Sequence, residues 1–142
     1  MKKFILIIAM IGFFVQTQAQ ELKVADVPVT VTDAFTLANP TIKDADWSKV
    51  GNNYAAEYDV NQLEKSITYD PAGVLVGMNE EIKVTALPAP VMAYVQKDNK
   101  EAKIMGAHKN TDAIGTVTYE AETVGNNLFF DSNGIFVKSV KN

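Results

Sequence analysis

Alternating apolar and polar side chains mark residues 54–60 as a strand with one buried face. Tyr54 and every second residue after it would point to one side of this strand, whereas Glu57 and Asp59 would point to the other. Such alternation is typical of an antiparallel sheet that packs one face on a core and leaves one face in solvent. We therefore expect Glu57 and Asp59 on the solvated face of a sheet.

The same alternation returns at residues 116–124, where Glu120 and Glu122 take the outward positions. Further strands are expected where short apolar runs lie between turn residues, at 45–50, 66–69, 74–83, 102–109, 127–131 and 135–140. Turns rich in Asn, Asp and Gly join them, because these residues tolerate positive φ, at 51–53, 61–62, 70–73 and 131–134. The pattern predicts a largely antiparallel sheet.

Residues 26–38 show the spacing of a helix. An apolar stripe occupies positions i, i+3, i+4 and i+7, namely Val31, Ala34, Phe35 and Ala38. Asp26 is expected to cap this helix, and Pro28 fits its first turn. A strand over 27–32 is the alternative, because valines alternate there.

A second helix is expected at residues 87–97. Pro88 and Pro90 suit a helix entrance, and Val91 and Tyr94 belong to its buried stripe. The chain thus contains two segments in which a helix precedes a series of strands.

Matching motifs indicate that the chain contains one unit twice. Val27-Pro28 matches Leu87-Pro88 at an offset of sixty residues, and a Tyr-x-Ala-Glu motif recurs at an offset of sixty-five. Two Asp-x-x-Gly turns lie sixty-one residues apart. We expect an α+β fold in which two tandem helix-plus-antiparallel-strand repeats, about 24–84 and 85–142, form one domain over 20–142. Its antiparallel sheet should be curved, with the helices on one face.

Residues 1–19 have the composition of a secretory signal peptide. Lys2 and Lys3 precede an apolar run over 4–15, and Ala19 offers a small residue before a cleavage point. This run is too short to span the roughly 30 Å of a bilayer core, and no other apolar run in the sequence approaches its length. No membrane insertion is therefore expected after its removal. The mature chain would begin at Gln20 with a loosely ordered polar leader.

Charge excludes nucleic acid as a partner. The 142 residues include 13 lysines, no arginine and 17 acids. Removal of residues 1–19 takes away two lysines and no acid, which leaves 11 − 17 = −6. Positive charge supplies most of the affinity for a phosphate backbone, and this chain lacks it. The chain also has no cysteine, and its length allows a monomeric domain to bury a core without disulfides.

The sequence contains no arrangement typical of a catalytic centre. It has no cysteine, no serine in a Gly-x-Ser-x-Gly turn and a single histidine, His108, which we expect to be a partly buried strand residue. We therefore expect a protein that is not an enzyme and has no cofactor. One alternative stays open: the four outward acids of the two expected strands could gather on a sheet face and bind a cation such as calcium, or a small ligand.

Three aromatic side chains lie close together in the sequence of the first repeat. Trp47, Tyr54 and Tyr58 are expected in the core, since aromatic residues bury large areas. The alternative is an exposed aromatic anchor for a partner.

The order of the motifs is informative as a set. The first repeat has Val-Pro, Asp-x-Asp-Trp47, Tyr-x-Ala-Glu-Tyr58 and an Asp-x-x-Gly turn, and the second has Leu-Pro, Tyr-Glu-Ala-Glu and Phe-Asp-x-x-Gly. This order resembles the PepSY-like domains of Bacteroidota, also described as β-lactamase-inhibitor-protein-like (BLIP-like), over residues 24–140. The resemblance implies a periplasmic protein with a protein-binding or inhibitory role, and it supplies no catalytic residues. We expect a periplasmic or cell-envelope protein to bind the sheet face at Glu57, Asp59, Glu120, Glu122 and Trp47.

Overall fold

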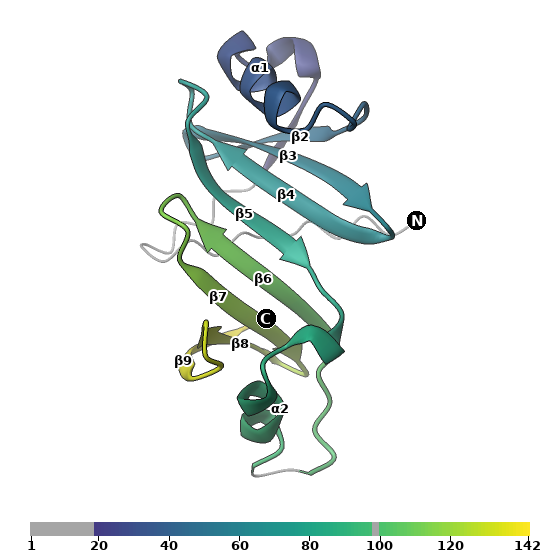
Figure 1. Cartoon of the computed structure of the whole chain (residues 1–142), viewed down its shortest axis with the longest axis vertical. Helices are drawn as coiled ribbons and strands as arrows, with labels where there is room; N and C mark the ends of the chain where they lie inside the picture. Colours follow the sequence, from purple (N-terminus) through teal and green to yellow (C-terminus); the bar gives the residue numbers. More distant parts are fainter. Residues whose placement is uncertain (1–18, 98–99) are drawn as a thin grey trace. The chain divides into compact units, whose positions relative to one another are not determined.

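The structure, a computed structural model, describes residues 19–97 and 100–142. The described part has two α-helices and nine strands, and the strands lie in the sheet in chain order from β1 to β9 (Figure 1). Their bounds are β1 Gln20–Leu22, α1 Val29–Ala38, β2 Asp46–Val50, β3 Asn53–Val60, β4 Leu63–Tyr69, β5 Leu75–Glu81, α2 Ala89–Val95, β6 Gly106–Asp112, β7 Val117–Thr123, β8 Asn126–Asp131 and β9 Phe136–Lys141. The predicted α+β class with an antiparallel sheet is confirmed.

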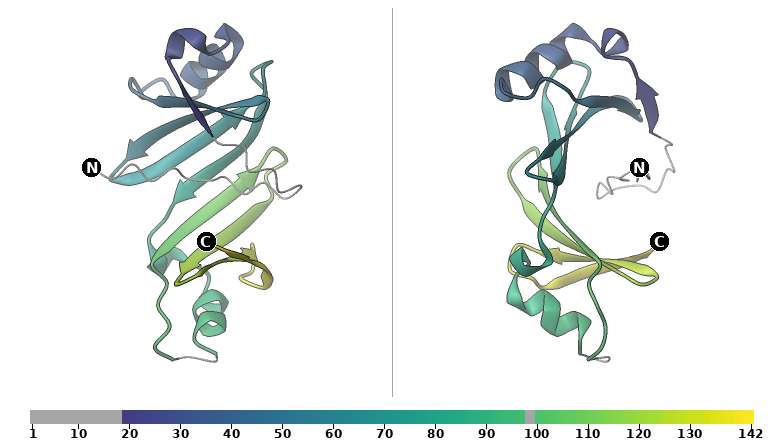
Figure 2. Two further views of the ribbon diagram at one scale, coloured as in Figure 1. Left: turned by 180° about the vertical axis from the view of Figure 1, so that it is seen from behind. Right: turned by 90° about the vertical axis from the view of Figure 1, so that its right-hand side faces the viewer.

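The chain divides into two compact units. The first contains the described residues up to Tyr58 together with Ser66–Val76, and the second contains Asp59–Lys65 and Gly77–Asn142. Figure 2 shows each helix beside strands of its own unit. Each unit therefore contains one of the two α-helices.

In the first unit, α1 packs on the sheet through Val31 and Phe35. The ring of Phe35 meets the indole of Trp47 edge-on, with the two ring centroids 5.4 Å apart, and it meets Tyr58 in the same way at 5.6 Å. Trp47 is 6% exposed. The expectation that Trp47 lies in the core is confirmed, and its assignment to a partner-binding surface is wrong.

Both helices begin after a proline. The expected cap at Asp26 is wrong: Val24–Asp26 form a 3₁₀ turn (η1), and Pro28 is the N-cap of α1 without a side-chain hydrogen bond. The cause is local, because a residue that precedes proline is pushed out of the helical region, and Val27 has φ −87° and ψ 135°. The second unit repeats this start, with the 3₁₀ turn Val84–Ala86 (η2) and Pro88 as the N-cap of α2.

The segment predicted as a loose leader forms strand β1. Gln20 pairs with Lys49 and Leu22 pairs with Trp47, so β1 lies antiparallel to β2. Three residues are too few to show alternation, and β1 is defined by its backbone pairing with β2. The sequence pattern therefore predicted the other eight strands but missed this one.

The core of the second unit lies between α2 and strands β7 to β9. Val91, Ala121 and Phe130 are its fully buried members. Tyr94 stacks on Phe136, with ring centroids 4.6 Å apart, and meets Phe130 edge-on at 5.5 Å. Ala121 and Phe130 point to α2, so their neighbours Glu120 and Phe129 point to the opposite face of the sheet.

Strand β6 begins later than expected, at Gly106 instead of 102. The apolar residue that suggested an earlier start, Ile104, packs against the core cluster from a loop. At the far end the strand runs to Asp112, whose Oδ1 accepts hydrogen bonds from the N–H groups of Ile114 and Thr116. Gly115 then closes a third Asp-x-x-Gly turn, which was not predicted.

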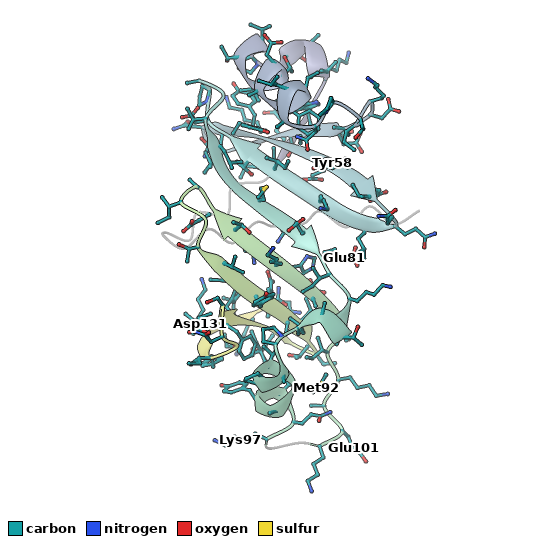
Figure 3. All side chains as sticks on the ribbon, in the orientation of Figure 1. Tyr58, Glu81, Met92, Lys97, Glu101 and Asp131 are labelled. Atoms are coloured by element: carbon teal, nitrogen blue, oxygen red, sulfur yellow. The ribbon has the colours of Figure 1, made fainter. Side chains whose placement is uncertain are left out.

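The two Asp-x-x-Gly turns of the repeat occupy equivalent places. Asp131, labelled in Figure 3, ends β8, and its Oδ1 accepts hydrogen bonds from the N–H groups of Asn133 and Ile135. Gly134 has φ +80° and lies so close to α2 that an added Cβ would be 2.9 Å from Pro88 Cβ. Gly73 has φ +82°, and its Cβ would be 2.5 Å from the carbonyl oxygen of Thr30 in α1. In each unit the turn glycine allows the hairpin to lie against the start of the helix.

Candidate functional site: the acidic face of the second unit

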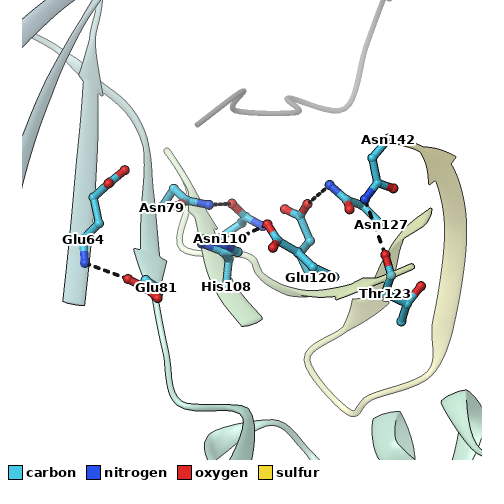
Figure 4. Close-up of polar contacts among 10 residues, drawn as sticks. Glu64, Asn79, Glu81, His108, Asn110, Glu120, Thr123, Asn127 and Asn142 are labelled. Carbon is cyan, nitrogen blue, oxygen red and sulfur yellow. Dashed lines mark hydrogen bonds and ion pairs between the residues drawn. The ribbon is translucent and has the colours of Figure 1, made fainter. Parts of the chain in front are cut away.

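Three ionisable side chains lie side by side on the face of the second unit opposite α2. The strand register pairs Glu81 of β5 with His108 of β6, and His108 with Glu120 of β7 (Figure 4). Directly opposed residues in an antiparallel sheet share a face. The imidazole therefore lies between two carboxyl groups on neighbouring strands.

Glu122 also contacts the imidazole of His108, from the position two residues after Glu120 on the same face of β7. Its Oε1 is 3.2 Å from His108 Nε2. Glu122 pairs with Gly106, and a Cβ at Gly106 would be 2.5 Å from Glu122 Oε2. The absence of a side chain at Gly106 therefore allows the Glu122 carboxylate to lie over β6 and reach His108.

Amide side chains form hydrogen bonds that fix the orientation of side chains on this face. Asn127 Nδ2 donates a hydrogen bond to Glu120 Oε1 over 2.8 Å, and Asn79 Nδ2 donates one to Asn110 Oδ1 over 2.6 Å (Figure 4). Asn79 and Asn110 are directly opposed on β5 and β6. The side chains of the face are thus held by hydrogen bonds within the unit.

Glu64 of β4 extends the face. Its backbone N–H donates a hydrogen bond to Glu81 Oε2 over 3.2 Å. Burial raises the pKa of the Glu64 carboxyl, and the negative charges of Asp59 and Glu81 raise it further, whereas His108 lowers it. Asp59 and Glu81 therefore both lie near enough to Glu64 to act on its carboxyl group. We call the set Asp59, Glu64, Glu81, Glu120 and Glu122 the acidic face.

Burial also raises the pKa of Glu120, which is 7% exposed. His108 opposes this rise, Glu122 adds to it, and the hydrogen bond from Asn127 opposes it. A carboxyl group whose pKa is raised is held in a setting that disfavours its charge. Glu120 and Glu64 are thus the two members of the face whose pKa is raised by burial.

On the opposite side of the same strands, the carboxylate of Glu80 is paired with lysines. Glu80 Oε1 is 2.6 Å from Lys65 Nζ, and Glu80 Oε2 is 3.7 Å from Lys109 Nζ. The hydrogen bond from Lys65 lowers the pKa of Glu80. Within the described residues no ion pair joins a lysine to a carboxylate of the acidic face.

The structure places three of the four acids proposed from the sequence in the second unit. Asp59, Glu120 and Glu122 belong to the acidic face, whereas Glu57 belongs to the first unit, where it pairs with Asp46. Glu64, Glu81 and His108 were not predicted to belong to this face. Glu81 is brought there by its pairing with a strand 27 residues later in the chain, a register that no local pattern reveals.

The cation alternative is not supported. Among the residues described, no group of three or more His, Asp or Glu side chains is arranged to hold a metal ion. Glu120 and Glu122 instead bond to Asn127 and His108.

Catalysis finds no support at His108 either. Its Nε2 faces Glu122, and its buried Nδ1 has no hydrogen-bond partner in the described part of the chain. No hydroxyl group is bonded to it there, so no nucleophile is paired with this base. His108 is 5% exposed, more deeply buried than predicted.

A separate cleft of about 540 Å³ lies beside the end of α2. It is lined by apolar side chains such as Tyr94 and Leu128 and by Lys97 and Glu101, two residues labelled in Figure 3. Lys97 and Glu101 are exposed and carry opposite charges, so they do not form a buried polar site for a ligand. No helix within residues 19–97 and 100–142 is long and apolar enough to cross a bilayer.

Comparison with known proteins gives a clear answer for the fold. No family model matches the chain, and no curated protein matches it. Solved structures do match. A candidate periplasmic protein from Bacteroides eggerthii has a TM-score of 0.74 at 14% identity, over 81% of this chain and 88% of the other.

Two further structures agree with it. A DUF2874 family protein from Bacteroides uniformis has a TM-score of 0.72 at 15% identity, over 80% of this chain and 88% of the other. A BLIP-like protein from Bacteroides fragilis has a TM-score of 0.61 at 18% identity, over 80% and 86%. The resemblance stated from the sequence is thus confirmed at the level of the fold: the chain has the fold of the Bacteroides DUF2874 and BLIP-like proteins.

Proposed function

We propose that the chain is a periplasmic binding module without enzymatic activity, and that it binds a cell-envelope protein through the acidic face of its second unit. The binding would be inhibitory if the bound surface includes the partner's own functional site. The name of the Bacteroides fragilis protein, BLIP-like, supports this inhibitory reading.

One observation carries the proposal. The sheet face opposite α2 carries polar side chains that are already held in place by hydrogen bonds from His108, Asn127 and Asn79. A surface whose rotamers are fixed before binding loses less conformational entropy on association. This favours recognition of a partner over a purely structural role.

Location in the periplasm rests on two supports. The composition of residues 1–19 is that of a signal peptide, although most of that segment lies outside the described residues. The structural match from Bacteroides eggerthii is described as a candidate periplasmic protein.

Site-directed crosslinking tests the proposal. The chain has no cysteine, so one introduced cysteine can carry a photocrosslinker at a single position. Thr118 pairs with Asn110 on the same side as the acidic face, whereas Thr111, on the neighbouring strand, points to the opposite side. Thr118→Cys and Thr111→Cys are therefore matched probes of the two faces.

The labelled mature protein is exposed to cell-envelope extract and then illuminated. We expect one protein to crosslink reproducibly from position 118 and not from position 111. Equal crosslinking from both positions, or none from position 118, would overturn the proposal.

A further inference from the structure

We propose that the free edge of strand β9 binds an extended, acidic segment of a partner protein as an added strand of the sheet. None of the residues of β9 belongs to the acidic face. This edge is therefore a second interaction surface, and it does not depend on the proposed function.

The backbone of β9 has hydrogen-bonding groups on its outer side. In the described sheet β9 lies at one end of the strand order and pairs with β8 alone. Asn142 N–H donates to the carbonyl oxygen of Gly125 over 3.4 Å, so these two residues form a hydrogen-bonded pair at the end of the ladder. Such pairs alternate with non-hydrogen-bonded ones, and the register has no bulge between Lys141 and Ser139. The N–H and C=O groups of Ser139 and Lys141 therefore point away from β8.

This edge is open to solvent. Val137, Ser139 and Lys141 are exposed, and the residues between them are half-buried. An accessible row of backbone donors and acceptors is the template on which an extended peptide adds a strand. In that mode the main-chain hydrogen bonds provide affinity, whereas the side chains select the partner.

The side chains of β9 favour an acidic partner. Lys138 and Lys141 are its charged residues, and within the described part of the chain no carboxylate forms an ion pair with either. Lys138 Nζ lies 4.8 Å from the centre of the Phe129 ring, a contact that supplies no oxygen acceptor for its N–H donors. The charge of β9 is thus opposite to the net charge of the mature chain, and it attracts carboxylates.

The acidic face lies too far from this edge to repel an acidic strand strongly. Lys138 pairs with Phe129, which in turn pairs with Glu120. An added strand would lie three strand spacings, roughly 14 Å, from Glu120. The Debye length is about 8 Å at physiological ionic strength. The lysines next to the added strand therefore act on it more strongly than the carboxyl groups of β7.

The spacing of the two lysines predicts a motif in the partner. Positions three apart on a strand lie on opposite faces, so Lys138 and Lys141 lie on different sides of the sheet. Two acidic residues that are also three apart, acid-x-x-acid, would each lie opposite one lysine in either strand direction. One of the two residues between them would lie opposite Val140 and is expected to be apolar.

A second copy of this chain is a poor occupant of the edge. Two β9 strands side by side would bring lysines of like charge together, which is unfavourable. The other end of the sheet, β1, is only three residues long. The occupant is therefore a segment of another protein.

Nuclear magnetic resonance with the capped peptide Thr-Glu-Val-Val-Glu-Thr tests the inference. One control peptide has lysine in place of both glutamates. A second keeps the glutamates but carries a methyl group on the backbone nitrogen of each valine, which removes one donor from each edge of the peptide.

Two double variants of the protein with the same change in net charge are compared. Lys138→Gln with Lys141→Gln removes charge from β9. Lys23→Gln with Lys83→Gln removes the same charge from the exposed positions that precede η1 and η2.

We expect the glutamate peptide to protect the amide N–H groups of Ser139 and Lys141 from hydrogen exchange, because they become donors to the added strand. Both control peptides should bind about tenfold more weakly or not at all. The β9 variant should weaken binding of the glutamate peptide about tenfold, while the control variant stays within about twofold of the wild type.

Four results would overturn the inference. Absence of protection at Ser139 and Lys141 would show that the edge is not used, and undiminished binding of the methylated peptide would show that no strand is added. Equal weakening in both double variants would show that net charge alone attracts the peptide. A dimer of the protein alone, with the same two amides protected, would make a second copy the occupant. Crosslinking from position 118 reports on the acidic face and is independent of these results.

Discussion

At the residue scale, Glu80 on β5 and Glu120 on β7 lie in opposite environments within the second unit. Glu120 is buried beside other carboxyl groups, which raises its pKa, and Glu80 bonds to Lys65, which lowers its pKa. Both pKa values depart from the ordinary value of 4.5. The fold therefore opposes ionisation of Glu120 and favours ionisation of Glu80.

We predict that Glu120→Gln stabilises the protein at neutral pH, with a rise in melting temperature of about 3 °C, roughly 1 kcal/mol in a domain of this size. A raised pKa in the folded state means that the contribution of Glu120 to stability is present in acid and lost as the pH rises through the folded pKa. The advantage of the glutamine should therefore disappear as the pH falls to 4.5 and below. Thermal melts across a range from acid to neutral pH measure it.

Glu80→Gln is the matched control, and its effect has the opposite sign. The lowered pKa of Glu80 contributes stability above the unfolded pKa, and this contribution is lost as the pH falls through the folded value. The glutamine at position 80 should lower the melting temperature at neutral pH and have no effect in strong acid. Stabilisation by both variants at neutral pH would contradict the assignment of the two environments.

The side chains of the acidic face could be predicted from the sequence only in part. Alternation along β7 assigns Glu120 and Glu122 to one side, because that information lies within a single strand. It cannot show that Glu64 and Glu81 approach them, since that depends on register between strands far apart in the chain. The burial of Glu120, expected to be solvated, has the same origin: neighbouring strands, and not its own, determine its surroundings.

At the element scale, the Asp-x-x-Gly hairpins of the repeat are contacts between a turn and a helix. Gly73 combines positive φ with a close approach to the carbonyl oxygen of Thr30, whereas Gly115 has φ +87° and nothing within 4 Å of an added Cβ. Adding a side chain at Gly115 would therefore cause backbone strain alone, whereas adding one at Gly73 would cause both strain and a steric clash.

We predict that Gly73→Ala lowers the free energy of unfolding by about 3 kcal/mol, because left-handed backbone strain and overpacking against α1 add together. Gly115→Ala should cost only about 1 kcal/mol, from the strain alone. Urea unfolding followed by circular dichroism measures both. If the two variants lose the same stability, the contact between the 70–73 turn and α1 does not contribute.

The element boundaries show where sequence patterns stop being informative. The helices were predicted at the right places, yet α1 starts three residues after Asp26 because the Val-Pro dipeptide excludes a helical residue before the proline. Strand β6 was predicted to begin too early because Ile104 is partly buried from a loop, and an apolar residue in a loop looks the same in sequence as one in a strand. Strand β1 has no pattern of its own and is defined by its partner β2.

At the scale of the whole molecule, the composition of residues 1–19 predicts where the protein is located. We predict that the protein expressed in a Bacteroidota host is recovered from the periplasmic fraction with its N-terminus at Gln20. The reason is the basic and apolar leader that ends at Ala19. Mass spectrometry of the intact protein identifies the cleavage point, and Lys2→Glu with Lys3→Glu should retain the uncleaved protein in the cytoplasm. A full-length chain in the periplasm would contradict the predicted cleavage.

The two ends of the strand order bear on self-association. An unpaired strand edge is a template on which a second chain can add, and sheets left open are prone to polymerise. Here one end is β1, only three residues long, and the other is β9, which carries Lys138 and Lys141 and no acid. Brevity at one edge and repulsion between like charges at the other discourage copies of the chain from joining into fibres. An open sheet can thereby exist in this fold without its edges serving as templates for amyloid growth.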